Sequence, residues 1–287
     1  MYQQLGFTYT LRRVSMLAIP VGAYSALAHL KDIPPFLYVP NIPEGLEAAL
    51  GLAVAMLLTF RINRAYERWW EARTLWGTLV NVSRNLAIKV RQLADPEPDE
   101  ANRACDLVIE FAYKLKHHLG DCGPHSTEGH IPSRVTSDLY ALLSKWHTSG
   151  KITDGELYTI DRDARVLMDV CGGCEKIRNT LMSSSWYLLM RQCIALYLLV
   201  LPWGLIDSLE WFTIPVSVLV AYLIISGEFI AHYVERPFGK TEDHLDLDSI
   251  CQGIENSVND IRTYQVGTPR PDEHAEDVEL STASPAI

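Results

Sequence analysis

The sequence lacks most of what an enzyme or a nucleic-acid-binding protein requires. Its 287 residues include 25 Lys and Arg against 35 Asp and Glu, so the formal net charge is −10. This balance argues against nucleic acid as a partner, because binding it requires a basic patch. The sequence has no Gly-rich phosphate loop, no Gly-x-Ser-x-Gly elbow and no His-Glu-x-x-His zinc motif. We therefore expect no enzymatic activity, no cofactor and no metal site.

Charge is also missing from four long stretches of the chain. Apolar residues make up 48% of the sequence, and they gather in blocks instead of the amphipathic stripes typical of soluble proteins. The blocks are residues 14–30, 46–60, 187–206 and 211–233. Their length and composition predict an all-α membrane protein with four transmembrane helices.

The segments between these blocks predict how the helices connect. No helix breaker follows the second block until Pro96 and Pro98, so we expect one long helix from residue 44 to about 93. A turn of about four residues, 207–210, separates the last two blocks and predicts a helical hairpin. The full predicted layout is 1–73, an N-terminal segment with transmembrane helices 1 and 2; 74–186, a cytosolic helical domain; 187–234, transmembrane helices 3 and 4; 235–264, a cytosolic C-terminal helical segment; and 265–287, a disordered tail.

Basic residues predict the orientation of the spans. Arg12 and Arg13 precede the first block, an Arg-rich segment follows the second, and Arg236 follows the fourth. Because cytosolic flanks carry the excess of Lys and Arg, all three flanks and both termini are expected in the cytosol.

Two readings from other functional classes stay open at this stage. Cys171 and Cys174 form a Cys-x-x-Cys pair, which leaves a membrane thiol oxidoreductase as an alternative. A lone pair has neither the further ligands of a zinc site nor the βαβ setting of a thioredoxin site, so buried small residues are the favoured interpretation. The other alternative is a membrane-anchored signalling or scaffold protein, which ion flux in liposomes would distinguish from a channel.

The second block carries an apolar stripe and ends in a polar, aromatic segment. Leu52, Met56 and Phe60 lie at i, i+4 and i+8, on one face of a helix. From pattern alone, such a stripe is ordinary core or lipid contact. In the segment 61–73 that follows, we expect ion pairs at helical spacing, Arg64 with Glu67 and Arg68 with Glu71.

Two motifs then show a family resemblance. The run FRINRAYERWWEARTLWGTLVNVSRNLA, residues 60–87, is similar to the signature of the bacterial bestrophin-like proteins. The segment 235–239, Glu-Arg-Pro-Phe-Gly, resembles the Asn-Pro-Phe-Gly motif that follows the last span in that family. The resemblance covers about residues 5–260. It implies a bestrophin-like homopentamer in the bilayer of a bacterial inner membrane, with a pore for monovalent ions on the five-fold axis.

The same resemblance implies roles for particular residues. In the family, three apolar side chains of the second helix form a narrow neck, and by register these are Leu52, Met56 and Phe60. An apolar ring excludes water when it is narrow, so it can act as a gate. A second, cytosolic constriction is implied on a later helix, and Ile160 is its candidate.

The charge of the permeant ion is predicted from the outer loops. Four carboxylates are expected on the outer side and could form acidic rings: Glu44, Glu47, Asp207 and Glu210. Rings of carboxylates favour cations, so we expect a weak cation preference. The alternative is an anion channel like the animal bestrophins.

Overall fold

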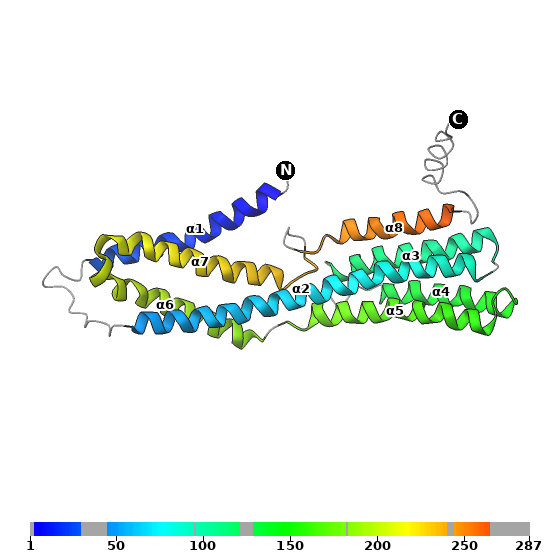
Figure 1. Ribbon diagram of the computed structural model, residues 1–287, viewed down its shortest axis with the longest axis horizontal. Helices are drawn as coiled ribbons and strands as arrows, with labels where there is room; N and C mark the ends of the chain where they lie inside the picture. Colours follow the sequence, from blue (N-terminus) through cyan, green and yellow to red (C-terminus); the bar gives the residue numbers. More distant parts are fainter. Residues whose placement is uncertain are drawn as a thin grey trace, which may run out of the picture. The chain divides into compact units, whose positions relative to one another are not determined.

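The described part of the chain is entirely helical. The structure is a computed structural model that describes residues 3–29, 45–94, 96–120, 129–181, 183–239 and 244–264, with side chains from residue 14 onward. Every element within these ranges is a helix (Figure 1), which confirms the predicted all-α fold class. In chain order the elements are α1 (Gln3–Ala28), α2 (Leu46–Gln92), α3 (Pro98–Leu119), α4 (Ile131–Thr148), α5 (Asp154–Asn179), α6 (Ser184–Leu209), the 3₁₀ turn η2 (Glu210–Phe212), α7 (Thr213–Val234) and α8 (Leu247–Thr263). The predicted tail, 265–287, lies outside the described residues.

Helix α2 is one unbroken element of 47 residues, which confirms the predicted long helix. At a rise of 1.5 Å per residue it is about 70 Å long. It begins after Gly45, whose φ of 91° is a conformation that glycine adopts without strain. Glu47 in its first turn, and Lys89 and Arg91 in its last, match the helix dipole. The helix ends before Pro96 and Pro98, and Pro98 opens α3, where its missing N–H breaks no helical hydrogen bond.

Two helical stretches of the described chain are long and apolar enough to cross a membrane. They are Leu46–Gln92 and Ser184–Val234, and the apolar stretch Val14–Ala28 is shorter. The second stretch is the predicted hairpin, α6 and α7 joined by η2. The turn is tighter than predicted, because α6 runs to Leu209 and the chain reverses at Glu210, whose φ is 47°.

The chain divides into two compact units, and α2 contributes residues to both. Unit 1 comprises residues 1–78, 117–126 and 169–247. In this unit α1 packs against α7 and α6. A Cβ added at Gly22 of α1 would lie only 2.7 Å from Cγ2 of Val218 on α7. Glycine is therefore what lets these two apolar helices approach each other, as is common between membrane helices.

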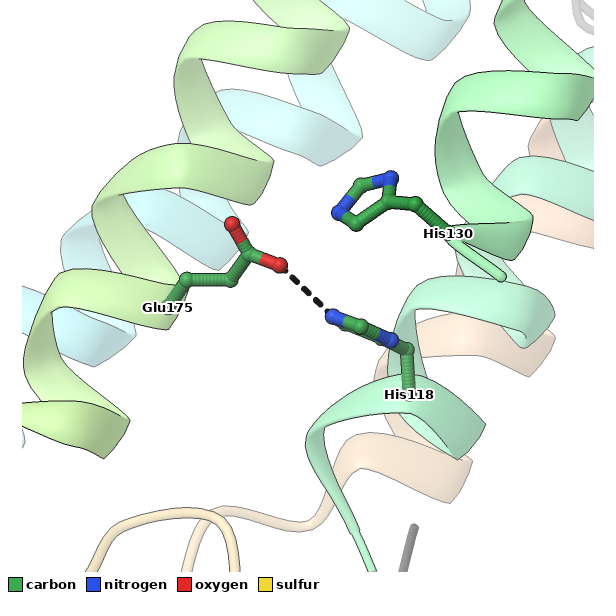
Figure 2. A group of neighbouring side chains, drawn as sticks. All are labelled: His118, His130 and Glu175. Carbon is green, nitrogen blue, oxygen red and sulfur yellow. Dashed lines mark hydrogen bonds and ion pairs between the residues drawn. The ribbon is translucent and has the colours of Figure 1, made fainter. Parts of the chain in front are cut away.

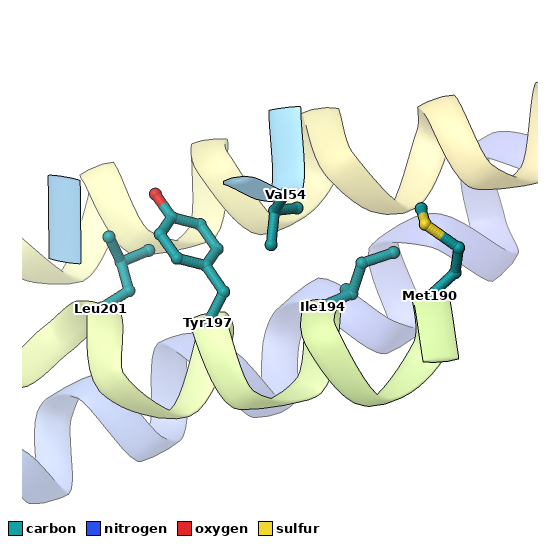
Figure 3. Close-up of a cluster of buried hydrophobic side chains, with 5 residues drawn as sticks. All are labelled: Val54, Met190, Ile194, Tyr197 and Leu201. Atoms are coloured by element: carbon teal, nitrogen blue, oxygen red, sulfur yellow. The ribbon is translucent and has the colours of Figure 1, made fainter. Parts of the chain in front are cut away.

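The inner face of α2 packs on α6 in unit 1. Figure 3 shows the buried cluster, which consists of Val54, Met190, Ile194, Tyr197 and Leu201. Its four α6 residues lie at i, i+4, i+7 and i+11, a single stripe along the helix. Because Val54 is only 3% exposed, this side of α2 is its packed side, and the opposite side remains uncovered in the protomer.

Unit 2 spans residues 79–116, 127–168 and 248–287, and its described residues form a helical bundle. Buried side chains at its centre include Phe111, Leu115, Leu139, Leu143, Trp146, Ile160 and Leu167. Glu100 at the start of α3 accepts hydrogen bonds from the Lys145 and Lys151 ammonium groups and from the Trp146 indole, at 2.6, 2.7 and 2.9 Å. These bonds hold the start of α3 against the end of α4, and they lower the pKa of Glu100 from 4.5 to about 2, the Lys145 bond contributing most.

Candidate functional site

The apolar stripe of α2 lies on the exposed side of that helix. Leu52, Met56 and Phe60 are 65%, 53% and 55% exposed in the protomer. Successive members of the stripe are four residues apart, so they rise about 6 Å and turn about 40° along the helix. Three large apolar side chains thus project in nearly one direction, away from the packed side that carries Val54.

The same side of α2 becomes polar beyond Phe60. Asn63, Glu67 and Thr74 are exposed, and each lies within about 60° of Leu52 around the helix axis. A hollow of about 650 Å³ opens beside this segment, lined by Phe60, Asn63, Arg64, Glu67, Ser183 and Trp186. The exposed side therefore changes from apolar to polar after Phe60.

The packed side of α2 holds a buried charge cluster directly after Phe60. The Arg61 side chain has no exposed surface and donates to Glu235 at 2.9 Å and to Glu228 at 3.3 Å. Its guanidinium carbon lies 4.4 Å from the centre of the Tyr187 ring, and the Tyr187 hydroxyl donates to Glu235. We call Arg61, Tyr187, Glu228 and Glu235 the Arg61 cluster. It joins α2 to the start of α6 and to the end of α7.

Arg68 extends these ties by two helical turns. Its guanidinium donates to the backbone carbonyl oxygens of Glu235, Ile177 and Thr180. Arg61 and Arg68 are seven residues apart and so lie on the same side of α2. The predicted pair of Arg68 with Glu71 is wrong, because Arg68 binds carbonyl groups and Glu71 accepts from Lys176 at 2.8 Å. The predicted Arg64–Glu67 pair is confirmed at 3.0 Å, with both side chains exposed.

Comparison with known proteins identifies the family. The sequence profile described as Bacterial/Fungal Bestrophin protein matches residues 11–260. The chain belongs to the bestrophin family. A bacterial bestrophin homologue from Klebsiella pneumoniae has the same fold, with a TM-score of 0.78 and 25% identity over 88% of this chain and 100% of that one.

Two curated relatives of this bestrophin are named as channels. A voltage-dependent anion channel-forming protein of Ralstonia nicotianae is 31% identical, over 84% of this chain and 83% of that protein. A protein of the same name from Escherichia coli strain K12, YneE, is 30% identical over 72% of each chain. As a member of this family, the chain is a membrane protein.

Three members of the Arg61 cluster did not emerge as a site from the sequence. Glu228 is the single Asp, Glu, Lys or Arg between Thr213 and Val234. An ionisable residue in an apolar span is a functional candidate by default, so this signal was available. Glu235 lies in the motif segment 235–239, and Tyr187 carries no signal that pattern alone reveals.

Ile160, the candidate for a second constriction, lies on α5 in unit 2 and stays a prediction. Its side chain is fully buried among the helices of unit 2. In the protomer, Ile160 fills the interior of the bundle. The exposed side of α5 in this region carries Tyr158, 71% exposed, and Arg162.

The outer carboxylates differ in their surroundings. Glu44 lies outside them. Glu47 is half-buried, and its methylene groups pack over Gly204 of α6. Asp207 and Glu210 are exposed at the α6–α7 turn. Counting acidic residues therefore overstated the number of fully exposed carboxylates at the start of α2.

The Cys171–Cys174 pair shows no sign of thiol chemistry. Both thiols are fully buried in α5, and burial raises the pKa of each to about 12. A thiolate is the reactive form, so neither side chain is primed as a nucleophile. The next residue of α5, Glu175, contacts His118 Nε2 at 2.6 Å (Figure 2). This contact ties the end of α3 to α5.

Proposed function

We propose that this bestrophin is a homopentameric ion channel in which Leu52, Met56 and Phe60 of five α2 helices form the pore neck. The exposed stripe of α2 carries this proposal. In the protomer, three large apolar side chains are exposed on one side of a helix whose other side is packed. Five copies around an axis would turn the stripe into three apolar rings about 6 Å apart.

The residues around the stripe support a pore over simple lipid contact. Ala48, Ala49, Ala53 and Ala55 are exposed on α2 and allow close approach of neighbouring copies. The stripe also continues into Asn63, Glu67 and Thr74 on the same side, so a path along this side would pass from the apolar rings to polar groups. An ion crossing the rings would lose hydration without a polar ligand in return, so the neck would act as a gate.

The permeant ion that we propose is an anion. The relatives in Ralstonia and Escherichia bear the name anion channel-forming protein, and this favours the anion alternative over the predicted cation preference. That prediction counted carboxylates in the outer loops without knowing which way they face. Of the four, Glu47 packs on α6 and Glu44 lies outside the described residues.

The membrane arrangement that we propose follows from the distribution of charge. Residues 14–30, the first part of α2, α6 and α7 make four spans in the inner membrane of a bacterium, with both termini in the cytosol. Residues 74–186 and 235–264 then form the cytosolic part. The composition of these segments supports the layout.

The test combines mass and current. The purified protein in detergent is expected to have the mass of five chains, and single channels in planar bilayers are expected to conduct. Under a tenfold KCl gradient an ideally selective channel reverses about 59 mV from zero, and we expect the sign of the chloride potential. Reversal at the potassium potential would refute anion selectivity alone, whereas a monomer or an absence of current would refute the channel.

A further inference from the structure

The Arg61 cluster and the proposed neck lie on opposite sides of the same turn of α2. Arg61 directly follows Phe60. Around the helix axis it lies about 100° from Phe60, 140° from Met56 and 180° from Leu52. The exposed fractions agree, since Arg61 is completely buried while the three neck residues are more than half exposed. The guanidinium therefore binds its partners on the side of α2 opposite the stripe, at the level where the stripe ends.

Burial makes this cluster an unusual way to join helices. Arg61 carries one positive charge against two negative charges on Glu228 and Glu235, a formal balance of −1. The Arg61 and Glu235 side chains are 0% and 2% exposed, and Glu228 is 17% exposed. Removing charges from water is costly, and apolar residues of similar size often hold a fold as well or better. Since Val54 and its neighbours already pack α2 on α6, cohesion alone does not explain the cluster.

Ionic hydrogen bonds supply a fixed geometry that apolar packing does not. Arg61 is held by two carboxylates and faces the Tyr187 ring at once. These contacts come from α6, from Glu228 of α7 and from Glu235 directly after α7, so they constrain both the rotation of α2 and its distance from its neighbours. Apolar side chains allow small sliding and rolling, whereas planar bidentate groups such as guanidinium do not.

We propose that Arg61, Tyr187, Glu228 and Glu235 are positioning residues that set the rotation and radius of the neck at Phe60. This inference rests on the proposed neck. The cluster fixes how far each Phe60 side chain projects toward the pore axis. It thereby sets the fraction of time in which water fills the neck. Loosening it changes channel opening chiefly through Phe60, the neck residue next to Arg61 in the chain.

The decisive experiment is a double-mutant cycle between the cluster and Phe60. Glu235→Gln, Glu228→Gln and Tyr187→Phe remove a charge or a hydroxyl while keeping size, each in the wild-type neck and with Phe60→Ala. Open probability comes from single-channel recording, and the melting temperature of the assembled protein reports stability. Glu71→Gln is the matched control, because Glu71 is on the same helix and pairs with Lys176 at the exposed surface.

We expect each cluster variant to change open probability several-fold in the wild-type neck, Glu235→Gln most. With Phe60→Ala the same variants should change it less than twofold, because a neck without the ring no longer depends on its position. Melting temperature should fall equally in both backgrounds, and Glu71→Gln should leave open probability unchanged. If Glu235→Gln does not assemble, Glu228→Gln and Tyr187→Phe give the answer, since the bond between Arg61 and Glu235 remains in both.

Two outcomes overturn the inference. Variants that lower melting temperature without altering open probability would make the cluster purely structural. Effects of equal size with and without Phe60→Ala would show that it does not act through the neck. In either case a conducting wild type leaves the proposed function intact, whereas a wild type without current refutes that function and this inference together.

Discussion

Truncating the neck to alanine separates a pore from a core or a lipid-facing surface. Burying a side chain of this size fully is worth about 1.5–3 kcal/mol. Leu52, Met56 and Phe60 are 65%, 53% and 55% exposed, so each change to Ala should cost only about 0.5–1.4 kcal/mol in the protomer. In a packed core the same truncations cost about 2–5 kcal/mol each. The triple variant is therefore expected to assemble.

The effect on current should be large. Removing three apolar rings widens the neck and lets water enter, so a passing ion keeps more of its hydration. A decrease of about 1.4 kcal/mol in the barrier raises the rate of passage tenfold. We expect the triple variant to show at least a several-fold increase in single-channel current or open probability, measured together with oligomer yield.

The control comes from α6. Leu188, Leu196 and Leu199 are 58%, 54% and 56% exposed and share one side of that helix, so the triple Ala variant removes comparable apolar surface. It should leave conduction unchanged. An assembled neck variant with wild-type current would refute the neck assignment, and loss of assembly in the neck variant alone would place the stripe in a core. An equal increase in both variants would mean that general loosening raises the current.

Three further predictions concern other parts of the chain. Changing Cys171 and Cys174 to Ser should leave flux and assembly intact, because both thiols are buried with pKa values of about 12; loss of flux in an assembled protein would contradict this. The folded-state pKa of Glu100 is lowered from 4.5 to about 2, so its stabilising effect is complete above pH 4.5 and disappears as the pH falls to about 2. Wild-type melting temperature should drop more steeply over that interval than that of Glu100→Gln, and parallel curves would rule out the contribution. Gly22→Ala should cost about 1–3 kcal/mol by overpacking against Val218. Val218→Ala in the same chain should restore the melting temperature, and a failure to do so would contradict the contact.

Much of the architecture could be predicted from the sequence because it depends on neighbouring residues. The absence of a proline between the second apolar block and Pro96 predicts α2 as one helix, and the structure confirms it. The spacing of Leu52, Met56 and Phe60 puts them on one side of that helix, and the exposed fractions agree. These results need only helical periodicity and the positions of helix breakers, which are local properties.

By itself the sequence determined a helical membrane protein and its family, while the tertiary structure decided which side of each helix is free. Ile160 shows the difference, since its helix was predicted and its burial in unit 2 was not. The Arg61 cluster shows it again, because the two residues of the Arg61–Glu235 bond are 174 positions apart in the chain. Periodicity describes the angle of a side chain about its own helix axis. Which neighbour occupies that direction depends on how several helices pack together, and this is decided by the burial energy of the whole unit.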